Sequence, residues 1–451
     1  MMRSHNMLKG PIWKEILIFF FPILLGYLFQ QLYNTVDAMV VGNFVGTIAL
    51  GAVGGSTSII INLIIGFVVG LSAGATVIIA QFIGANENQK VHLTVSTTMI
   101  MNIVLGMILM VIGLIFSKDM LKLLSVPDEM MKDALVYLRL YLLGLVPTMI
   151  YNAGAGILRA VGDSKRPLYF LIAASITNIV LDILLVVYGH MGVAGAAMAT
   201  IASQVVTCVL TLYVFQDKDE IYYLDLKHMN FDYALFKRII GIGLPTAIQG
   251  SVYSFANLFI QASVNSYGTI SVASFTAFGK IDMFFWNFSG AMGASCLTFV
   301  GQNFGAKQFE RVKKGIRIAL VMFLIGSIGI TILSISFGEH FYRLFTQDPE
   351  VLKVGMQILW LVGPFWNVIS FLEIYSASLR AMNVILAPML MSLFGVGVIR
   401  IFWVLFYPGK SILDTLLVYP LSWCLTSFFF IVFYNSGLWK KKRKSSQKKE
   451  R

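Results

Sequence analysis

The sequence predicts an all-α polytopic membrane protein, with twelve transmembrane helices in two six-helix lobes related by a pseudo-twofold axis along the membrane normal. Composition is the first observation, since 57% of the 451 residues are hydrophobic and only 12% are charged. An internal repeat is the second, because the second half of the chain matches the first. Two matching halves that each hold an even number of spans insert in the same orientation, which gives the axis along the membrane normal.

The repeat rests on three sets of residues that recur in the same order. Leu-Arg-Ala at 158–160 with Pro167 recurs at 379–381 with Pro388, a separation of 221 positions. Gln-x-x-Gly-Ala at 81–85 recurs at 302–306 with the same separation, and Pro22 and Asn34 match Pro245 and Asn257 at 223 positions. Agreement of this kind predicts two structurally equivalent halves.

Twelve apolar blocks follow one another along the chain, six in each half. A helix needs roughly 20 apolar residues to cross the hydrocarbon core. The blocks lie at about 16–40, 48–80, 91–117, 135–158, 167–190, 192–215, 235–263, 270–300, 312–338, 355–378, 388–407 and 411–437. We therefore expect an N-lobe at 1–215, a cytoplasmic linker at 216–234, a C-lobe at 235–439 and a basic cytoplasmic tail at 440–451.

Basic residues predict the orientation, because Lys and Arg gather in cytoplasmic loops. With the N-terminus inside, 25 of the 34 Lys and Arg residues fall in cytoplasmic segments and six fall in external loops. Both termini are thus predicted to be cytoplasmic. The net charge of +12 follows from this bias and from a tail that faces anionic membrane lipids, so we expect no nucleic-acid partner.

The linker is the one substantial polar interruption of the apolar pattern. Tyr222, Tyr223, Leu224, Leu226 and Phe231 alternate irregularly with charges in it. Such a pattern is typical of an interfacial segment that lies on the inner leaflet.

Enzyme motifs are missing from the sequence. It contains neither the phosphate-binding G-x-x-x-x-G-K-[ST] nor the zinc-binding H-E-x-x-H, and its five His residues are scattered. We therefore expect no enzyme, no catalytic residues and no cofactor. Movement of a solute across the bilayer is the function that remains.

Polar residues inside the spans are the candidates for that function, since a charge at membrane depth costs at least about 2.5 kcal/mol. Gln30, Tyr33, Asn34 and Asp37 share one face of the first span, because they are spaced three and four apart. The fifth span carries Asn178 and Asp182, and the sixth carries Thr200 and Gln204, each pair four residues apart. The matching positions of the second half lack carboxylates, since Asp37 corresponds to Ile260 and Asp182 to Trp403.

Two carboxylates, an amide and a hydroxyl offer oxygen ligands to a hard monovalent cation, or a buried carboxyl group able to carry a proton. Asp37, Asn178, Asp182 and Thr200 are therefore the predicted ion-coupling residues, and the metal ligands if the ion is Na⁺. A second interpretation stays open. Asp37 would then be wetted at the outer end of its span, and Asn178 and Asp182 would only hydrogen-bond between helices.

The seventh span carries Gln249, Tyr253, Asn257 and Gln261 at four-residue spacing, a polar stripe without charge. Together with Gln30, Tyr33 and Asn34 it would line a substrate cavity. The 35 Phe and 22 Met residues would make the rest of such a cavity aromatic and deformable, which suits amphipathic cations. For the other charged residues within spans, namely Lys280, Asp282, Glu373 and Arg400, we expect pairing with other helices rather than transport.

These motifs as a set resemble the multidrug and toxic compound extrusion (MATE) family over about residues 16–437. They are Gln30-x-x-Tyr33-Asn34-x-x-Asp37-x-x-x-Val41-Gly42, the twin Gln-x-x-Gly-Ala ends of the second and eighth spans, and the twin Leu-Arg-Ala elements followed by proline. The resemblance implies two lobes around a V-shaped cavity and alternating access. It implies a monomeric secondary antiporter of the bacterial cytoplasmic membrane, which exports organic, mostly cationic amphipathic compounds in exchange for Na⁺ or H⁺.

Family members of the bacterial type hold the ion in the first lobe, on residues that match Asp37, Asn178, Asp182 and Thr200, and their first-helix cavity residues match Gln30 and Tyr33. One feature departs from the pattern, because the seventh-span carboxylate of some members has no counterpart between Gln249 and Gln261. Related lipid-linked oligosaccharide flippases are the alternative function. They share the architecture but usually need a strongly cationic cavity, which only Arg139, Lys280 and Arg400 would supply here. A non-transporting membrane scaffold would need no carboxylate pair in its spans.

Overall fold

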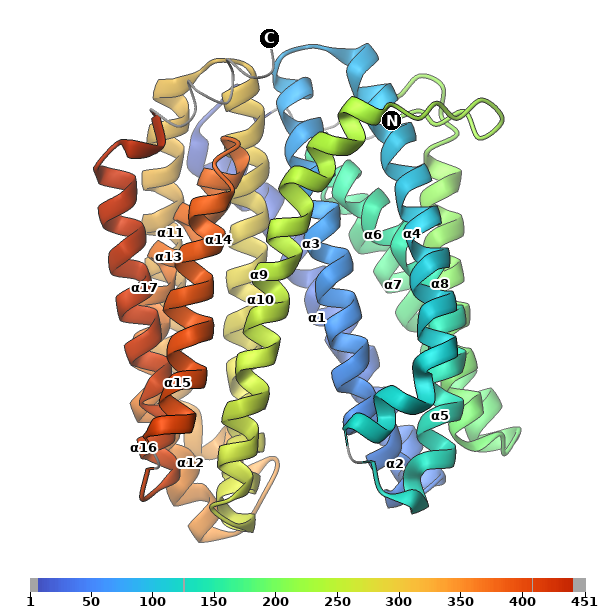
Figure 1. Ribbon diagram of the computed structural model, residues 1–451, viewed down its shortest axis with the longest axis vertical. Helices are drawn as coiled ribbons and strands as arrows, with labels where there is room; N and C mark the ends of the chain where they lie inside the picture. The colour runs from blue at the N-terminus through green and yellow to red at the C-terminus, as the bar shows by residue number, and fades with distance from the viewer. Residues whose placement is uncertain (1–6, 125, 408, 441–451) are drawn as a thin grey trace. The chain divides into compact units, whose positions relative to one another are not determined.

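The computed structural model describes residues 7–124, 126–407 and 409–440, and every regular element within these ranges is a helix (Figure 1). The first half contains α1 (Ile12–Phe44), α2 (Thr47–Gly54), α3 (Ser56–Gly84), α4 (Asn88–Leu123), α5 (Asp128–Leu143), α6 (Leu145–Ala160), α7 (Lys165–Asp182), the π-helix η1 (Ile183–Tyr188) and α8 (Gly192–Val214). The predicted basic tail, apart from Lys440, lies outside the described residues.

The second half repeats the series. It contains α9 (Tyr233–Asn265), α10 (Thr269–Gly305), α11 (Phe309–Arg343), α12 (Pro349–Val362), the 3₁₀ turn η2 (Gly363–Phe365), α13 (Trp366–Ala381), α14 (Leu386–Ser392), the π-helix η3 (Leu393–Val398), α15 (Ile399–Phe406), α16 (Ile412–Leu416) and α17 (Val418–Asn435). Eleven helices of the described chain are long and apolar enough to cross a membrane, and twelve if α5 and α6, bent by 50° at Gly144, form one span. The predicted fold class is confirmed.

The repeat extends to the backbone of the connecting turns. Left-handed residues occur in matching pairs: Asn86 (φ 57°) and Lys307 (φ 58°), Gly162 (φ 95°) and Asn383 (φ 64°), and Gly46 (φ 118°) and Gly268 (φ 88°). The first two pairs are 221 positions apart. Each of their members follows the end of a helix, where a left-handed residue lets backbone N–H groups bond back to the last carbonyls. Even Lys307 adopts this conformation, which a side chain disfavours.

Two compact units make up the molecule. Among the described residues, unit 1 contains Phe21–Ala247, and unit 2 contains Met7–Phe20 together with the chain from Ile248 onward. The boundaries fall inside α1 and α9, next to Pro22 and Pro245. Proline removes a hydrogen bond from a helix interior, so the chain passes from one unit to the other where its helices are weakest.

In unit 1, the first part of α9 contacts α3 backbone to backbone. A Cβ atom on Gly74 would lie 2.4 Å from the carbonyl oxygen of Ile239, and one on Gly70 would lie 2.4 Å from the Cα of Ala247. Gly243 is equally close to Leu71, whose carbonyl oxygen would lie 2.7 Å from an added Cβ. Small residues four apart on both helices permit this approach, as in many membrane helix pairs.

In unit 2, the start of α1 is held by larger side chains. The ring of Phe20 meets that of Phe288 edge to face, with centroids 5.6 Å apart. The guanidinium of Arg311 on α11 donates from Nη1 to the carbonyl of Gly10 at 2.9 Å and from Nη2 to that of Lys9 at 3.0 Å. The N-terminal segment therefore belongs to unit 2 through both ring packing and hydrogen bonds.

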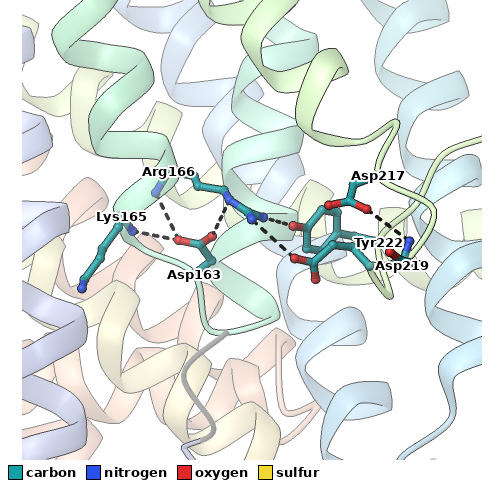
Figure 2. A network of polar contacts seen from close by, with 7 residues as sticks. Asp163, Lys165, Arg166, Asp217, Asp219 and Tyr222 are labelled. Carbon is teal, nitrogen blue, oxygen red and sulfur yellow. Dashed lines mark hydrogen bonds and ion pairs between the residues drawn. The ribbon is translucent and has the colours of Figure 1, made fainter. Parts of the chain in front are cut away.

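The linker between the halves is folded onto unit 1, as Figure 2 shows for its first part. Arg166, in the first turn of α7, forms ion pairs with Asp163 and with Glu220 of the linker, both at 3.4 Å, and donates to the hydroxyl of Tyr222. Asp163 also accepts from the backbone N–H groups of residues 165 and 166, at 3.0 and 3.1 Å. One arginine thus joins the start of α7 to the linker.

Some of the apolar linker residues predicted to lie on the inner leaflet are buried, and others are exposed. Tyr222 and Leu224 are buried against the protein, whereas Leu226 and Phe231 are about half exposed. The interfacial interpretation is therefore wrong for the first two, because the helices of unit 1 cover them. Further along, Asp225 accepts a hydrogen bond from His228, which holds the pKa of that carboxyl below its ordinary value.

Candidate functional site

The predicted ion site lies where α1 and α7 pack together within unit 1. The hydroxyl of Ser175 approaches the carbonyl of Phe29 at 3.4 Å, and a Cβ on Gly26 would lie 3.1 Å from the side chain of Leu171. Both helices start odd-numbered spans, so they run in the same direction. Two turns beyond Phe29 and Ser175, at 3.6 residues per turn, α1 reaches Asp37 and α7 reaches Asp182.

The acidic side chains at this position are enclosed and lack protein partners. Asp37 is 8% exposed, and Asn178 and Asp182 are 0% exposed. Both carboxylate oxygens of Asp182, Oδ1 of Asp37, and both amide atoms of Asn178 make no hydrogen bond with any residue that the structure describes. Asp37 lies close enough to Asp182 to interact with it electrostatically. Buried polar atoms are nearly always satisfied in proteins, so these oxygens are suited to hold a cation or a proton.

Thr200 completes the predicted set from α8, which packs on α7. Its hydroxyl donates to the carbonyl of Ala196 at 3.1 Å, which leaves oxygen lone pairs free to bind a cation. The side chain of Tyr137 on α5 lies near Thr200 and Asp37. The structure therefore brings Asp37, Asn178, Asp182 and Thr200 into one region of unit 1.

Tyrosines form one side of this region, and two of them were not singled out by the sequence. Tyr137 stacks on Tyr141, with ring centroids 6.5 Å apart, and both are buried. The side chain of Tyr33 on α1 lies near the side chains of Gln30 and Gln204. The four-residue spacing of Tyr137 and Tyr141 in the fourth span was the signal that would have found them.

The polar residues of the first span differ in how far they are buried. Tyr33 and Asp37 are buried and Gln30 is half-buried, but Asn34 is exposed. Asn34 is therefore open to its surroundings, while Asp37, three residues further along α1, is enclosed. Directly after Asp182 the helix widens into the π-helix η1, a local geometry that is frequent at functional sites.

The donor atoms of this site determine which ion it could bind. No group of three or more His, Cys, Asp or Glu side chains in the described chain is placed to hold a metal ion. Its donors are instead two carboxylates, one amide oxygen and one hydroxyl, a hard-oxygen set. Such a set fits a monovalent cation or a proton rather than a transition metal.

In unit 2, most of the predicted polar stripe on α9 is bound by other residues. Gln249 donates from Nε2 to the hydroxyl of Ser392 at 2.8 Å, and its Oε1 accepts from Arg380 at 3.3 Å. Gln261 donates to Asn265 at 2.9 Å on its own helix. Tyr253 lies beside Gln249 and Ser392.

Asn257, the remaining member of the stripe, contacts a buried arginine. Arg400 on α15 donates from Nη1 to Oδ1 of Asn257 at 2.8 Å and from Nε to the hydroxyl of Ser422 at 3.2 Å. The expected interhelical pairing of Arg400 is therefore present, although its partners are neutral.

The other charged residues in these spans differ among themselves. Asp282 accepts from the indole N–H groups of Trp286 at 2.8 Å and Trp366 at 2.9 Å. Lys280 is exposed. Glu373 packs against α10 where Gly293 leaves room, since an added Cβ there would lie 2.1 Å from its Oε1. Asp282 is thus held by tryptophans and forms no ion pair with Lys280.

Known proteins resemble this chain over its whole length. The MatE family model matches residues 22–184 and 245–405, more than half of the chain. The probable multidrug resistance protein YoeA of Bacillus subtilis is 28% identical over 448 residues, which cover 96% of each chain. A FAD transporter of Shewanella oneidensis is 27% identical over 395 residues, 84% of this chain and 85% of that protein.

Solved structures show the same fold. A multidrug resistance MATE family transporter of the MOP superfamily, in an outward-facing conformation, superposes with a TM-score of 0.88 at 22% identity, over 99% of this chain and 100% of the other. The matched family model covers both halves of the repeat, and eleven or twelve apolar helices of the described chain are long enough to cross a membrane. The chain belongs to the MatE family and is a multi-pass membrane transporter.

Proposed function

We propose that this protein is a cation-coupled antiporter that exports small organic compounds, with Na⁺ or H⁺ bound in unit 1 by Asp37, Asn178, Asp182 and Thr200. The observation that carries the proposal is the set of enclosed oxygen atoms on Asp37, Asn178 and Asp182 that no described residue satisfies. Two carboxylates near one another are costly in a membrane unless a cation or a proton compensates them.

Binding of the cation would change the charge of this region, and this is what couples the ion to transport. With the site filled, the α1–α7 pair is electrically compensated. With it empty, the carboxylates repel each other, and the helices that carry them are driven toward another arrangement. Thr200 and Tyr137 would orient the oxygens, since the side chain of Tyr137 lies near Thr200.

We assign contacts with the organic compounds to two sets of residues. They are Gln30, Tyr33 and Asn34 in unit 1, and Gln249, Tyr253, Asn257 and Gln261 in unit 2. Relatives named as multidrug resistance proteins and as a FAD transporter support export of varied small organic compounds. Among these compounds we propose amphipathic cations, as expected from the sequence. We place the protein as a monomer in a bacterial cytoplasmic membrane, as expected from the resemblance. The 25 basic residues in the proposed cytoplasmic segments support the placement of both termini in the cytoplasm.

Asp37→Asn tests the proposal. The variant keeps the side-chain volume but loses the charge, so ion-driven export of ethidium should stop while the protein still inserts and folds. Everted vesicles expose the cytoplasmic face, so ethidium is supplied outside them and its uptake is followed. A Na⁺ gradient or a proton gradient with the higher concentration in the lumen, applied one at a time, distinguishes the two ions. Asp119→Asn is the matched control, because Asp119 is an exposed acid at the end of α4. Wild-type export by Asp37→Asn would remove Asp37 from the mechanism.

A further inference from the structure

Arg400 is a buried cation without an ion-pair partner. It is 3% exposed, and its hydrogen bonds go to a neutral amide and a neutral hydroxyl. Asp282 interacts with it electrostatically but does not form a salt bridge with it, and its two oxygens already accept from tryptophans. An arginine within a membrane span whose charge no described carboxylate neutralises is a candidate for function.

Aromatic rings hold the guanidinium in place. Its carbon lies 4.4 Å from the ring centroid of Tyr419 and 5.7 Å from that of Trp423. The rings of Tyr419 and Trp423 are 5.3 Å apart, and Trp286 meets Trp423 edge to face at 6.2 Å. Cation–π contacts of this kind stabilise the charge but do not neutralise it. The guanidinium of Arg400 is therefore positively charged, held between its hydrogen-bond partners and bordered by aromatic rings.

Donors remain for a ligand on one side of this group. A guanidinium has five N–H groups, and the two hydrogen bonds use Nε and Nη1. Nη2 donates to no described residue, and it is not one of the polar atoms sealed from solvent. Asn257, which holds Nη1 through its oxygen, is exposed and keeps its own amide N–H₂ available. N–H donors of a guanidinium and of an amide that is hydrogen-bonded to it are groups that bind a carboxylate or phosphate.

The repeat places Asn257 and Arg400 on the spans that correspond to the first and fifth spans, which carry carboxylates of the proposed ion site in unit 1. Asn257 corresponds to Asn34 in the first span, and Arg400 corresponds to Ile179, the neighbour of Asn178 in the fifth. The same pair of spans therefore carries carboxylates in unit 1 and an arginine in unit 2.

We propose that Arg400 and Asn257 form a binding site for the acidic group of an aromatic compound, a carboxylate or phosphate whose ring system packs on Tyr419 and Trp423. This deepens the proposed function, since it extends the exported compounds to aromatic acids and zwitterions. Its test is equilibrium binding without any gradient, so that it can fail while ion-coupled export stands, and the reverse.

The experiment compares two dyes of similar size and ring system, fluorescein, which is anionic, and rhodamine 6G, which is cationic. Each is titrated into purified full-length protein while native tryptophan emission is followed, because Trp286 and Trp423 border the site. Arg400→Gln should weaken fluorescein binding by about tenfold or more, the range of one lost charge-assisted hydrogen bond, and should leave rhodamine 6G binding unchanged. Lys280→Gln removes an exposed cation of the same unit and should change neither.

A second variant covers the case in which Arg400→Gln fails to fold. Asn257→Asp keeps the volume and places a carboxylate on the guanidinium, so it should abolish fluorescein binding in a protein that remains folded. Unchanged fluorescein affinity in both variants, or an equal loss for both dyes, would overturn the proposal. Phosphatidylglycerol is then added to the wild type. Retained fluorescein affinity supports an aromatic ligand, whereas displacement makes a lipid headgroup the occupant and overturns it.

Discussion

The α1–α7 pair of unit 1 and the α9–α15 pair of unit 2 occupy equivalent places in the repeat. Their charged residues differ in sign and in whether neighbouring side chains bond to them. In unit 1, Asp182 has no hydrogen-bond partner among the described residues. In unit 2, Arg400 is bonded to Asn257 and Ser422 and covered by two rings. Duplication has therefore preserved the helices and not their chemistry. Under the proposed function, a cation or proton compensates the carboxylates of the first pair, whereas Asn257, Ser422 and two rings surround the charge of the other.

The largest expected difference between the units is in cation affinity. Asp182→Asn removes an enclosed anionic oxygen, and we expect a loss of about 3 kcal/mol, a hundredfold in affinity for Na⁺ or H⁺. Asp282→Asn, the matched acid of unit 2, should leave cation affinity unchanged. Isothermal titration or cation-dependent tryptophan emission of purified protein measures both. The reverse pattern would place the ion in unit 2 and break the comparison.

The free energy of unfolding should depend more on the acid of unit 2 than on that of unit 1. Asp282→Ala leaves the indole N–H of the fully buried Trp366 without an acceptor, at a cost of about 2 kcal/mol. Asp182→Ala removes a carboxylate that makes no hydrogen bond in the described protein, so without cation it should not lower the unfolding temperature. Thermal unfolding in detergent, with Na⁺ replaced by choline, compares the two. A large destabilisation by Asp182→Ala would mean that its role is structural.

The smallest expected effect concerns Tyr137. Tyr137→Phe removes the hydroxyl of a side chain near Thr200 and should weaken cation binding by about 1 kcal/mol, or roughly fivefold. Tyr419→Phe makes the same change beside Arg400 and should leave cation binding intact. If the two variants behave alike in a cation titration, Tyr137 plays no part in the ion site.

Sequence reasoning predicted the helices better than the contacts between them. Length and hydrophobicity define a span, and spacing of three and four residues defines a face, so the twelve blocks and the pairing of Asn178 with Asp182 on one face followed directly. Which helix meets that face depends on packing. Asn257 belongs to the predicted stripe, but spacing within α9 carries no information about Arg400 on α15. The same limit explains why Tyr137 was missed, since spacing within one helix does not show which tyrosine of another helix lies near Asp37.

Certain backbone features also cannot be predicted from the spacing of apolar residues. The π-helices η1 and η3 occur in the fifth span of each half but at different positions, since η3 follows Ser392 and η1 follows Asp182. Both are surrounded by residues that a regular helix would also accept. The division of α1 at Phe20 and of α9 at Ala247 had a visible cause in Pro22 and Pro245, but the consequence for each unit depended on long-range packing.

The close approach of α3 and α9 bears on how the protein is made. Gly70 and Gly74 on α3 are covered by Ile239, Gly243 and Ala247, which the ribosome adds only after all of the first six spans and the linker. Until then, the glycine surface of α3 has no final partner in the membrane. We therefore expect unit 1 to reach its final packing only once synthesis of the second half has begun.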